Sequence, residues 1–259
     1  MEITNARVRV ASLAAAMHLG LSLVVSAVIA AVVFGVWYHF PYRELLGGFQ
    51  LFGLVVVVDV ICGPFLTLLL YSPFKRRSTL VFDLSVVAMV QLAAMMYGLY
   101  TVAQVRPVAL VFEVDRFVVV SAAQVVNSIE PSEPVKNGFS WFGPETLSVR
   151  EPKDAQERIK SLELSLQGIE PSVRVDWWQP YENGLDLVKN RMKLLRELYQ
   201  KQTKPDQEKI SVSLKELNML LDTTYYLPLV TQKSLDNCIV LLGADGVPRG
   251  FAMVNGFSD

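Results

Sequence analysis

Asp59 stands out chemically, because it is the one charged side chain in the apolar run 45–74. An aspartate at the centre of a membrane-spanning helix costs about 2.5–3.5 kcal/mol on insertion scales, so it should face other helices or water. Gly63 and Pro64 follow it by about one turn and Thr67 by about two. Pro64 cannot donate a backbone hydrogen bond and crowds the carbonyl four residues earlier, which predicts a kink. This spacing predicts a small polar pocket around Asp59.

Two roles for Asp59 fit this position, and its partners are expected among His18, Thr67 and Gln91. In the first, the carboxyl group contacts a partner protein or relays protons. In the second, it is a neutral, hydrogen-bonded acid that fixes helix packing. A proton relay usually has several carboxylates inside the membrane, whereas this run has one. The residues alone leave both interpretations open.

Asp83 begins the next apolar run and lies close in sequence to the basic triplet Lys75-Arg76-Arg77. A carboxylate there favours a helix N-terminus and is expected to pair with one of these basic side chains. The candidate membrane motif therefore comprises Asp59, Gly63, Pro64, Thr67, Asp83 and Gln91.

No enzyme motif is present: the chain has no GxSxG, Walker A, GxGxxG or HExxH sequence. Its histidines, His18 and His39, are not part of a ligand cluster, and Cys62 and Cys238 form no CxxC pattern. We expect the two cysteines to be buried packing thiols. A net charge of −1 without a basic stripe argues against nucleic-acid binding. The sequence thus predicts a protein without catalytic residues, metal or cofactor.

A second candidate site is the aromatic segment Trp177-Trp178-Gln179-Pro180-Tyr181. It is either a contact surface, formed by Trp177, Trp178, Pro180 and Tyr181, or a loop folded over the core.

Three apolar stretches must position these residues. The runs 11–38, 45–74 and 84–105 contain Asp59 as their single charged residue, and a helix of about 20 residues crosses the hydrocarbon layer. They predict transmembrane helices at about 14–37, 48–71 and 84–104, in contact with membrane lipid. The first run is too long for a cleavable signal peptide, and is interpreted as an uncleaved anchor.

Basic residues predict the orientation of these helices. Arg7 and Arg9 precede the first span, and the triplet 75–77 connects the second to the third. The positive-inside rule then places the N-terminus and this connection in the cytoplasm. Three crossings put the chain after Arg106 on the far side, which is the periplasm of a bacterium.

The predicted fold is three transmembrane helices in residues 1–106 followed by a small α+β periplasmic domain in residues 107–259. Alternating β-rich runs predict strands, and apolar spacing predicts amphipathic helices. The expected strands are 108–112, 117–121, 226–230, 238–242 and 251–254. The expected helices are 154–166, 185–199 and 213–221, and the expected irregular segments are 127–152 and 201–209.

Several short motifs follow one another along the chain in a characteristic order. In the membrane half these are Arg9, His18, Ser22, Trp37-Tyr38, Pro41, the run Val58 to Thr67, Phe82-Asp83-Leu84, Gln91-Leu92, Tyr97-Gly98 and Arg106-Pro107. Beyond it come Phe112, Asp115-Arg116-Phe117, Gly143-Pro144, Pro180-Tyr181 and Leu227-Pro228-Leu229. This arrangement resembles the TfpX/TfpZ family of type IV pilin accessory proteins, most closely over residues 7–120. His39 separates Trp37-Tyr38 from Pro41, where the family motif is tighter.

The resemblance implies an inner-membrane protein that assists type IV pilus assembly through non-catalytic contacts with a pilin subunit. Its membrane half is expected to engage the pilin's transmembrane helix and its periplasmic half the pilin's globular head. The alternative is a membrane-anchored periplasmic binding or sensing module of another envelope machine. The sequence does not define the oligomeric state.

Overall fold

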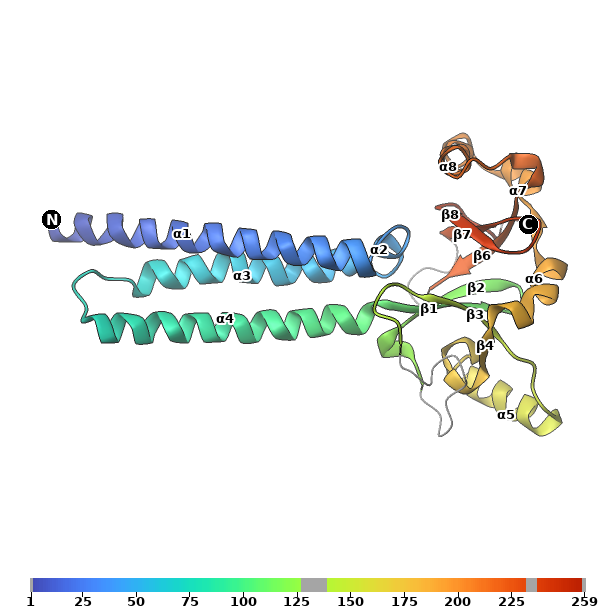
Figure 1. Ribbon diagram of the computed structural model, residues 1–259, viewed down its shortest axis with the longest axis horizontal. Helices are drawn as coiled ribbons and strands as arrows, with labels where there is room; N and C mark the ends of the chain where they lie inside the picture. The colour runs from blue at the N-terminus through green and yellow to red at the C-terminus, as the bar shows by residue number, and fades with distance from the viewer. Residues whose placement is uncertain (1, 127–138, 232–236, 258–259) are drawn as a thin grey trace. The chain divides into compact units, whose positions relative to one another are not determined.

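The computed structural model describes residues 2–126, 139–231 and 237–257, and it divides into two compact units, Met1–Val105 and Arg106–Asp259 (Figure 1). We refer to them as the helical unit and the sheet unit. Each has its own interior.

The helical unit contains three helices long and apolar enough to cross a membrane, which agrees with the predicted architecture of a membrane-anchored protein. Two of them extend beyond the predicted spans, since a helix continues past the hydrocarbon wherever its backbone bonds are maintained. The elements are α1 (Glu2–Val32), a π-helical turn η1 (Val33–Trp37), the short α2 (Tyr42–Leu45), α3 (Gly48–Leu70) and α4 (Arg77–Val105).

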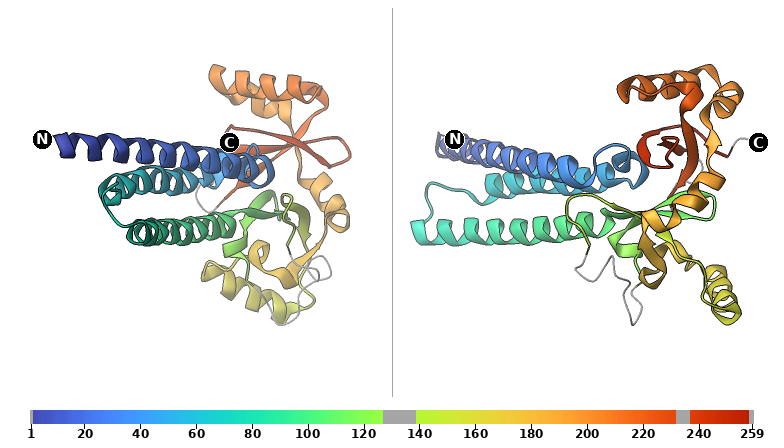
Figure 2. Two further views of the ribbon diagram at one scale, coloured as in Figure 1. Left: turned by 60° about the vertical axis from the view of Figure 1, so that its left-hand side comes forward. Right: turned by 45° about the vertical axis from the view of Figure 1, so that its right-hand side comes forward.

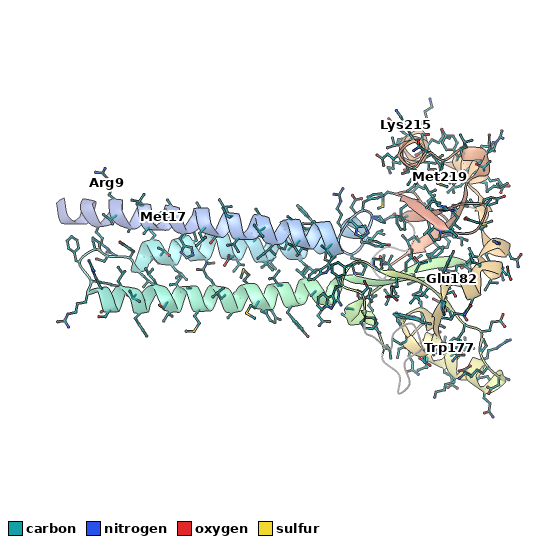
Figure 3. The ribbon with its side chains drawn as sticks, in the orientation of Figure 1. Arg9, Met17, Trp177, Glu182, Lys215 and Met219 are labelled. Atoms are coloured by element: carbon teal, nitrogen blue, oxygen red, sulfur yellow. The ribbon has the colours of Figure 1, made fainter. Side chains whose placement is uncertain are left out.

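Helix α3 is the central helix of this unit, because its contacts are with α1 and with α4 (Figures 1 and 2). Its inward face carries Phe52, Gly63 and Thr67, which are buried, while Ile61 and Phe65 are exposed. Apolar side chains also project outward along α1 and α4 (Figure 3). Exposed apolar side chains on long apolar helices are what a lipid environment requires.

Tyr38 ties the connection after α1 to α4. Its side chain is fully buried, and its hydroxyl donates a hydrogen bond of 2.8 Å to the carbonyl of Val102. A methyl group at Gly48 would overlap the Tyr38 ring, so the start of α3 fits closely against it. Phe34 packs edge-to-face on Phe52 with ring centroids 5.5 Å apart. This aromatic cluster therefore fixes one end of the three-helix layer.

The sheet unit is built on one mixed sheet with the strand order β4-β3-β1-β2-β6-β7-β8, and β5 pairs with β6 outside this path. The hairpin β1–β2 is antiparallel, β3 is parallel to β1, and β6 is parallel to β2. The strands are β1 (Pro107–Glu113), β2 (Arg116–Ser121), β3 (Glu145–Val149), β4 (Trp178–Pro180), β5 (Lys193–Leu194), β6 (Tyr225–Val230), β7 (Cys238–Leu242) and β8 (Pro248–Ala252).

Hydrophobic clusters formed by the described residues stabilise the sheet unit. One packs α7 (Leu195–Lys201) and α8 (Lys204–Glu216) against β6, β7 and β8, with Leu198 and Ile239 at its centre. Another covers β1, β2 and β3 with Val175 and Trp178. Burial of the sheet on both sides explains why β1 reads as a continuous apolar run.

Several predicted elements are confirmed, namely the hairpin and the strands near 226–230 and 238–242; the last strand lies slightly earlier than predicted. Helix α5 (Ala155–Leu166) is also confirmed, with the Asp154 side chain accepting a hydrogen bond of 2.7 Å from the Glu157 amide. Its apolar residues Ile159, Leu162 and Leu166 are exposed, whereas an amphipathic helix usually buries its apolar face.

Other predictions were wrong. The helix expected at 185–199 is divided into α6 (Leu185–Arg191), β5 and α7, because residues 193 and 194 pair with β6. The predicted irregular segment 201–209 contains the start of α8, and Ser213, where a helix was expected to begin, lies near the end of α8. Strand β3 falls within the predicted loop 127–152, whose first part lies outside the described residues.

Candidate functional site

Asp59 on α3 is bonded to Gln91 on α4, one of its three expected partners. The Gln91 side-chain amide donates to the Asp59 carboxylate oxygen Oδ1 at 3.2 Å and to the Asp59 backbone carbonyl at 3.3 Å. Among the described residues, no bond to the second carboxylate oxygen is recorded. The contact therefore holds α3 to α4 and leaves one carboxylate oxygen open to a further partner.

The other two expected partners, His18 and Thr67, bond to each other instead. His18 Nδ1 on α1 lies 2.6 Å from Thr67 Oγ1 on α3. The polar side chains of α3 thus bond in two directions, Asp59 to α4 and Thr67 to α1. These contacts join the three helices through their central member, as expected where water cannot satisfy polar groups.

A histidine beside a hydroxyl group is also the arrangement that activates a nucleophile, and sequence spacing did not indicate it. Thr67 is only 3% exposed, so its hydroxyl group is covered. Within the described residues, His18 has no carboxylate partner to orient its ring. The pair is suited to holding α1 against α3, not to attacking a substrate.

Gly63 provides the room that Gln91 needs. A methyl group at Gly63 would overlap the Gln91 amide, so glycine lets this side chain lie over α3 and reach Asp59. Pro64 lies next to it, half-buried, inside a helix that continues to Leu70. A cavity of about 10 Å³ is lined by Ser26, Phe52 and Asp59 among others. That is about the space of a single water molecule.

Asp83 lies in the second turn of α4 and pairs with the basic connection, as predicted. Its Oδ2 is 2.6 Å from Lys75 Nζ, which also donates to the Leu70 carbonyl at the end of α3 at 2.9 Å. Lys75 therefore joins the C-terminal end of α3 to the start of α4. Asp83 is not part of the Asp59 cluster, so the structure divides the candidate membrane motif into two places.

The aromatic segment lies inside the sheet unit. Trp177, Trp178 and Tyr181 are at most 7% exposed, whereas Pro180 is exposed. Trp178 Nε1 donates to the Ser172 carbonyl at 2.8 Å and the Tyr181 hydroxyl to the Gly246 carbonyl at 2.6 Å. Burial also raises the pKa of Tyr181. The rings fold over the core, so they do not offer the exposed surface that was one of the two expectations.

Cys62 also differs from its expectation. It is exposed on α3, three residues after Asp59, whereas Cys238 is buried in β7 as predicted. A thiol is small and apolar enough for a lipid-facing position. Among the described residues, no group of three or more His, Cys, Asp or Glu side chains could hold a metal ion.

Comparison with known proteins places this architecture among proteins of fimbrial assembly. The family model described as fimbrial assembly protein FimB matches residues 6–47. Fimbrial assembly proteins of Dichelobacter nodosus serogroups I and E1 are 34% and 33% identical to this chain over 226 residues, 87% of this chain and 88% of each relative. The protein of serogroups C1 and C2 is 43% identical over 110 residues, 42% of this chain and 84% of that relative. No solved structure matches.

Proposed function

This chain belongs to the FimB family of fimbrial assembly proteins, and we propose that it assists type IV fimbrial assembly as a non-catalytic accessory protein. The observation that carries the proposal is the extent of the similarity. An alignment over 226 residues is longer than either unit, so it includes parts of both the helical unit and the sheet unit. The TfpX/TfpZ resemblance supports the narrower assignment to pilin accessory proteins.

The proposed location is the bacterial inner membrane, with the N-terminus in the cytoplasm and the sheet unit in the periplasm. Arg7 and Arg9 near the start of α1 and the triplet 75–77 before α4 support this orientation through the positive-inside rule. The loop between α1 and α3 contains Arg43, which is paired with Glu44 at 3.5 Å.

The proposed partner is the pilin subunit, whose transmembrane helix would lie against α3. Two features support this part of the helix: the open carboxylate oxygen of Asp59 and the adjacent glycine and proline. A polar group inside the membrane can recognise a polar group on a neighbouring helix, because hydrocarbon offers neither group another partner.

Cys62 allows a direct test, since it is exposed on α3 close to Asp59 and the second cysteine, Cys238, is buried. Pilin variants with single cysteines along the transmembrane helix are produced with this protein, and the membranes are oxidised. We expect a disulfide-linked adduct only with pilin cysteines that lie on one face of the pilin helix. Cys62→Ser should give no adduct. Adducts of equal yield at every pilin position would indicate random collision and contradict the proposal.

Affinity purification of the full chain from detergent extracts is the complementary test. Recovery of the pilin supports the proposal. Recovery of another envelope component in its place would favour the alternative, a membrane-anchored binding or sensing module.

A further inference from the structure

A pocket of about 460 Å³ lies in the sheet unit between α5 and the segment 169–177. Its walls combine apolar groups with charged ones. Leu164, Ile169 and the Trp177 ring supply apolar surface, and the positive charge comes from Lys153, Lys160 and Arg174. None of these residues belongs to the membrane motif, so the pocket is separate from the proposed pilin contact.

Arg174 is the unusual group in this pocket. Its residue is only 5% exposed, and among the described residues neither Nε nor Nη1 has a hydrogen-bond partner. The guanidinium group lies over the Trp177 ring at 4.4 Å, which places the positive charge on an aromatic face. That contact leaves the in-plane N–H donors unused. A buried charge with unused donors is costly, so it needs a reason to be retained.

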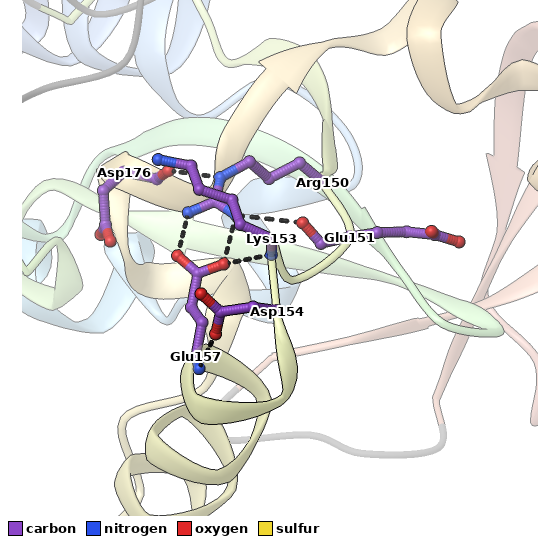
Figure 4. A network of polar contacts seen from close by, with 6 residues as sticks. All are labelled: Arg150, Glu151, Lys153, Asp154, Glu157 and Asp176. Atoms are coloured by element: carbon purple, nitrogen blue, oxygen red, sulfur yellow. Dashed lines mark hydrogen bonds and ion pairs between the residues drawn. The ribbon is translucent and has the colours of Figure 1, made fainter.

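One carboxylate in the wall of this pocket is already engaged by another arginine. Glu157 receives two hydrogen bonds from Arg150, at 2.9 and 2.7 Å, in the side-by-side geometry typical of an arginine–carboxylate pair (Figure 4). Arg150 also lies 4.7 Å from the Trp177 ring and donates to the Asp176 backbone carbonyl at 3.0 Å. Arg150 therefore has a carboxylate partner, whereas no hydrogen bond or ion pair joins Arg174 to a carboxylate in the part of the chain that the structure describes.

We propose that this pocket binds a carboxylate, held by Arg174, with the apolar part of the ligand against Trp177 and Leu164. A planar guanidinium group matches a carboxylate in shape and charge. Lys160 on α5 adds further positive charge at the wall. Three carboxylates also line the pocket and disfavour ligands with a large negative charge: Asp154, Asp176 and Glu157, the last of which is paired with Arg150. The ligand is thus a monocarboxylate with an apolar body, either a free acid or an acidic side chain of a partner protein.

Binding is tested on the full chain in lipid nanodiscs by calorimetry with two probes. Phenylacetate represents the free acid, with phenylacetamide as its neutral counterpart. The peptide acetyl-Phe-Glu-Leu-amide represents a protein side chain, and its glutamine version is the control. We expect at least one acidic probe to saturate a single site. Its neutral counterpart should bind at least about tenfold more weakly. Whichever probe binds identifies the source of the carboxylate.

Variants assign the binding to this pocket. Arg174→Met should weaken binding of the acidic probe by about tenfold or more, and Lys160→Gln by a smaller factor. Arg158→Gln, on the same helix but outside the pocket, should leave binding unchanged. If Arg174→Met fails to fold, Arg174→Lys preserves the charge and tests the loss of the planar fork. Absence of saturable binding, or equal binding by the Arg174 and Arg158 variants, overturns the proposal.

Discussion

At the scale of single residues, the bond between Gln91 and Asp59 separates two roles of the carboxyl group. Asn keeps an oxygen that can accept from Gln91, so Asp59→Asn should leave the α3–α4 contact and protein abundance intact. If the carboxylate contacts the pilin, surface fimbriae should nevertheless decrease. Electron microscopy with immunoblotting of membranes measures both quantities.

Asp59→Leu supplies the second half of this test. An apolar replacement of similar size can be neutral for stability, and the Gln91 amide retains the Asp59 backbone carbonyl as an acceptor. Normal fimbriation in both variants, at normal abundance, would show that the carboxyl group has no role beyond packing.

Gly63 offers a test of the same contact without changing either polar group. In Gly63→Ala, the new methyl group displaces the Gln91 amide from its place over α3, so the bond to Asp59 is lost. Gly53→Ala is the matched control. Gly53 lies on the same helix, and a methyl group added there meets no atom within 4 Å. We expect fewer fimbriae with Gly63→Ala and wild-type numbers with Gly53→Ala. Equal numbers for the two variants would argue against a role for the Asp59–Gln91 contact.

Glu157 makes part of the stability of the sheet unit depend on pH. Hydrogen bonds from Arg150 lower the pKa of Glu157 to about 2 from an ordinary value of 4.5. A lowered carboxyl pKa stabilises the folded state above the ordinary pKa, and this contribution disappears as the pH falls towards the lowered value. The midpoint of unfolding should therefore differ between wild type and Glu157→Gln at pH 5, and much less at pH 2. Glu163→Gln, exposed on the same helix, is the control and should show no such change.

At the scale of elements, helices of the sheet unit differ in how much they contribute to its core. Leu198 on α7 is 1% exposed, whereas Leu162 on α5 is 62% exposed. Leu198→Ala should lower the free energy of unfolding by about 2–5 kcal/mol. Leu162→Ala should change it by no more than about 0.5 kcal/mol. Pulse proteolysis of the full chain in urea measures both, and a large effect of Leu162→Ala would contradict the exposed position of this side chain.

Local sequence signals explain which elements could be predicted. The three long helices follow from length and hydropathy, which need no knowledge of the neighbours. Helix α8 could also have been found, since Pro205 at its first turn and Asp206 after it are typical of a helix start. The break between α6 and α7 could not, because residues 185–199 have good helical spacing. Pairing of Lys193 and Leu194 with β6 breaks it, and that partner strand lies some thirty residues later.

In the candidate site, too, some features have a local sequence signal and others depend on tertiary contacts. The position of Asp59 inside an apolar run made it predictable, and Gln91 was among its expected partners. The Arg150–Glu157 pair and the Arg174 pocket were not predicted, because their members meet through tertiary folding and have no recognisable spacing. The aromatic segment was conspicuous in composition, but burial depends on what packs over it, and composition does not contain that information.

At the scale of the whole molecule, the basic residues make a prediction about sidedness. A phosphatase reporter, which is active only outside the cytoplasm, should be active when fused after Ser121 and inactive when fused after Ser78. Ser78 follows the basic triplet at the start of α4, and Ser121 ends β2, beyond the third span. The reverse pattern would overturn the proposed periplasmic location of the sheet unit.

The strand order of the sheet has a consequence for the time course of synthesis. Starting from the β1–β2 hairpin, every later strand of the main path joins an edge that already exists: β3 beside β1, β4 beside β3, β6 beside β2, then β7 and β8 in turn. No strand has to be inserted between two that are already paired. The sheet can therefore grow outward in the order in which the ribosome delivers its strands, beginning two residues after the last helix of the anchor ends. Assembly from the first hairpin onward need not wait for the C-terminus.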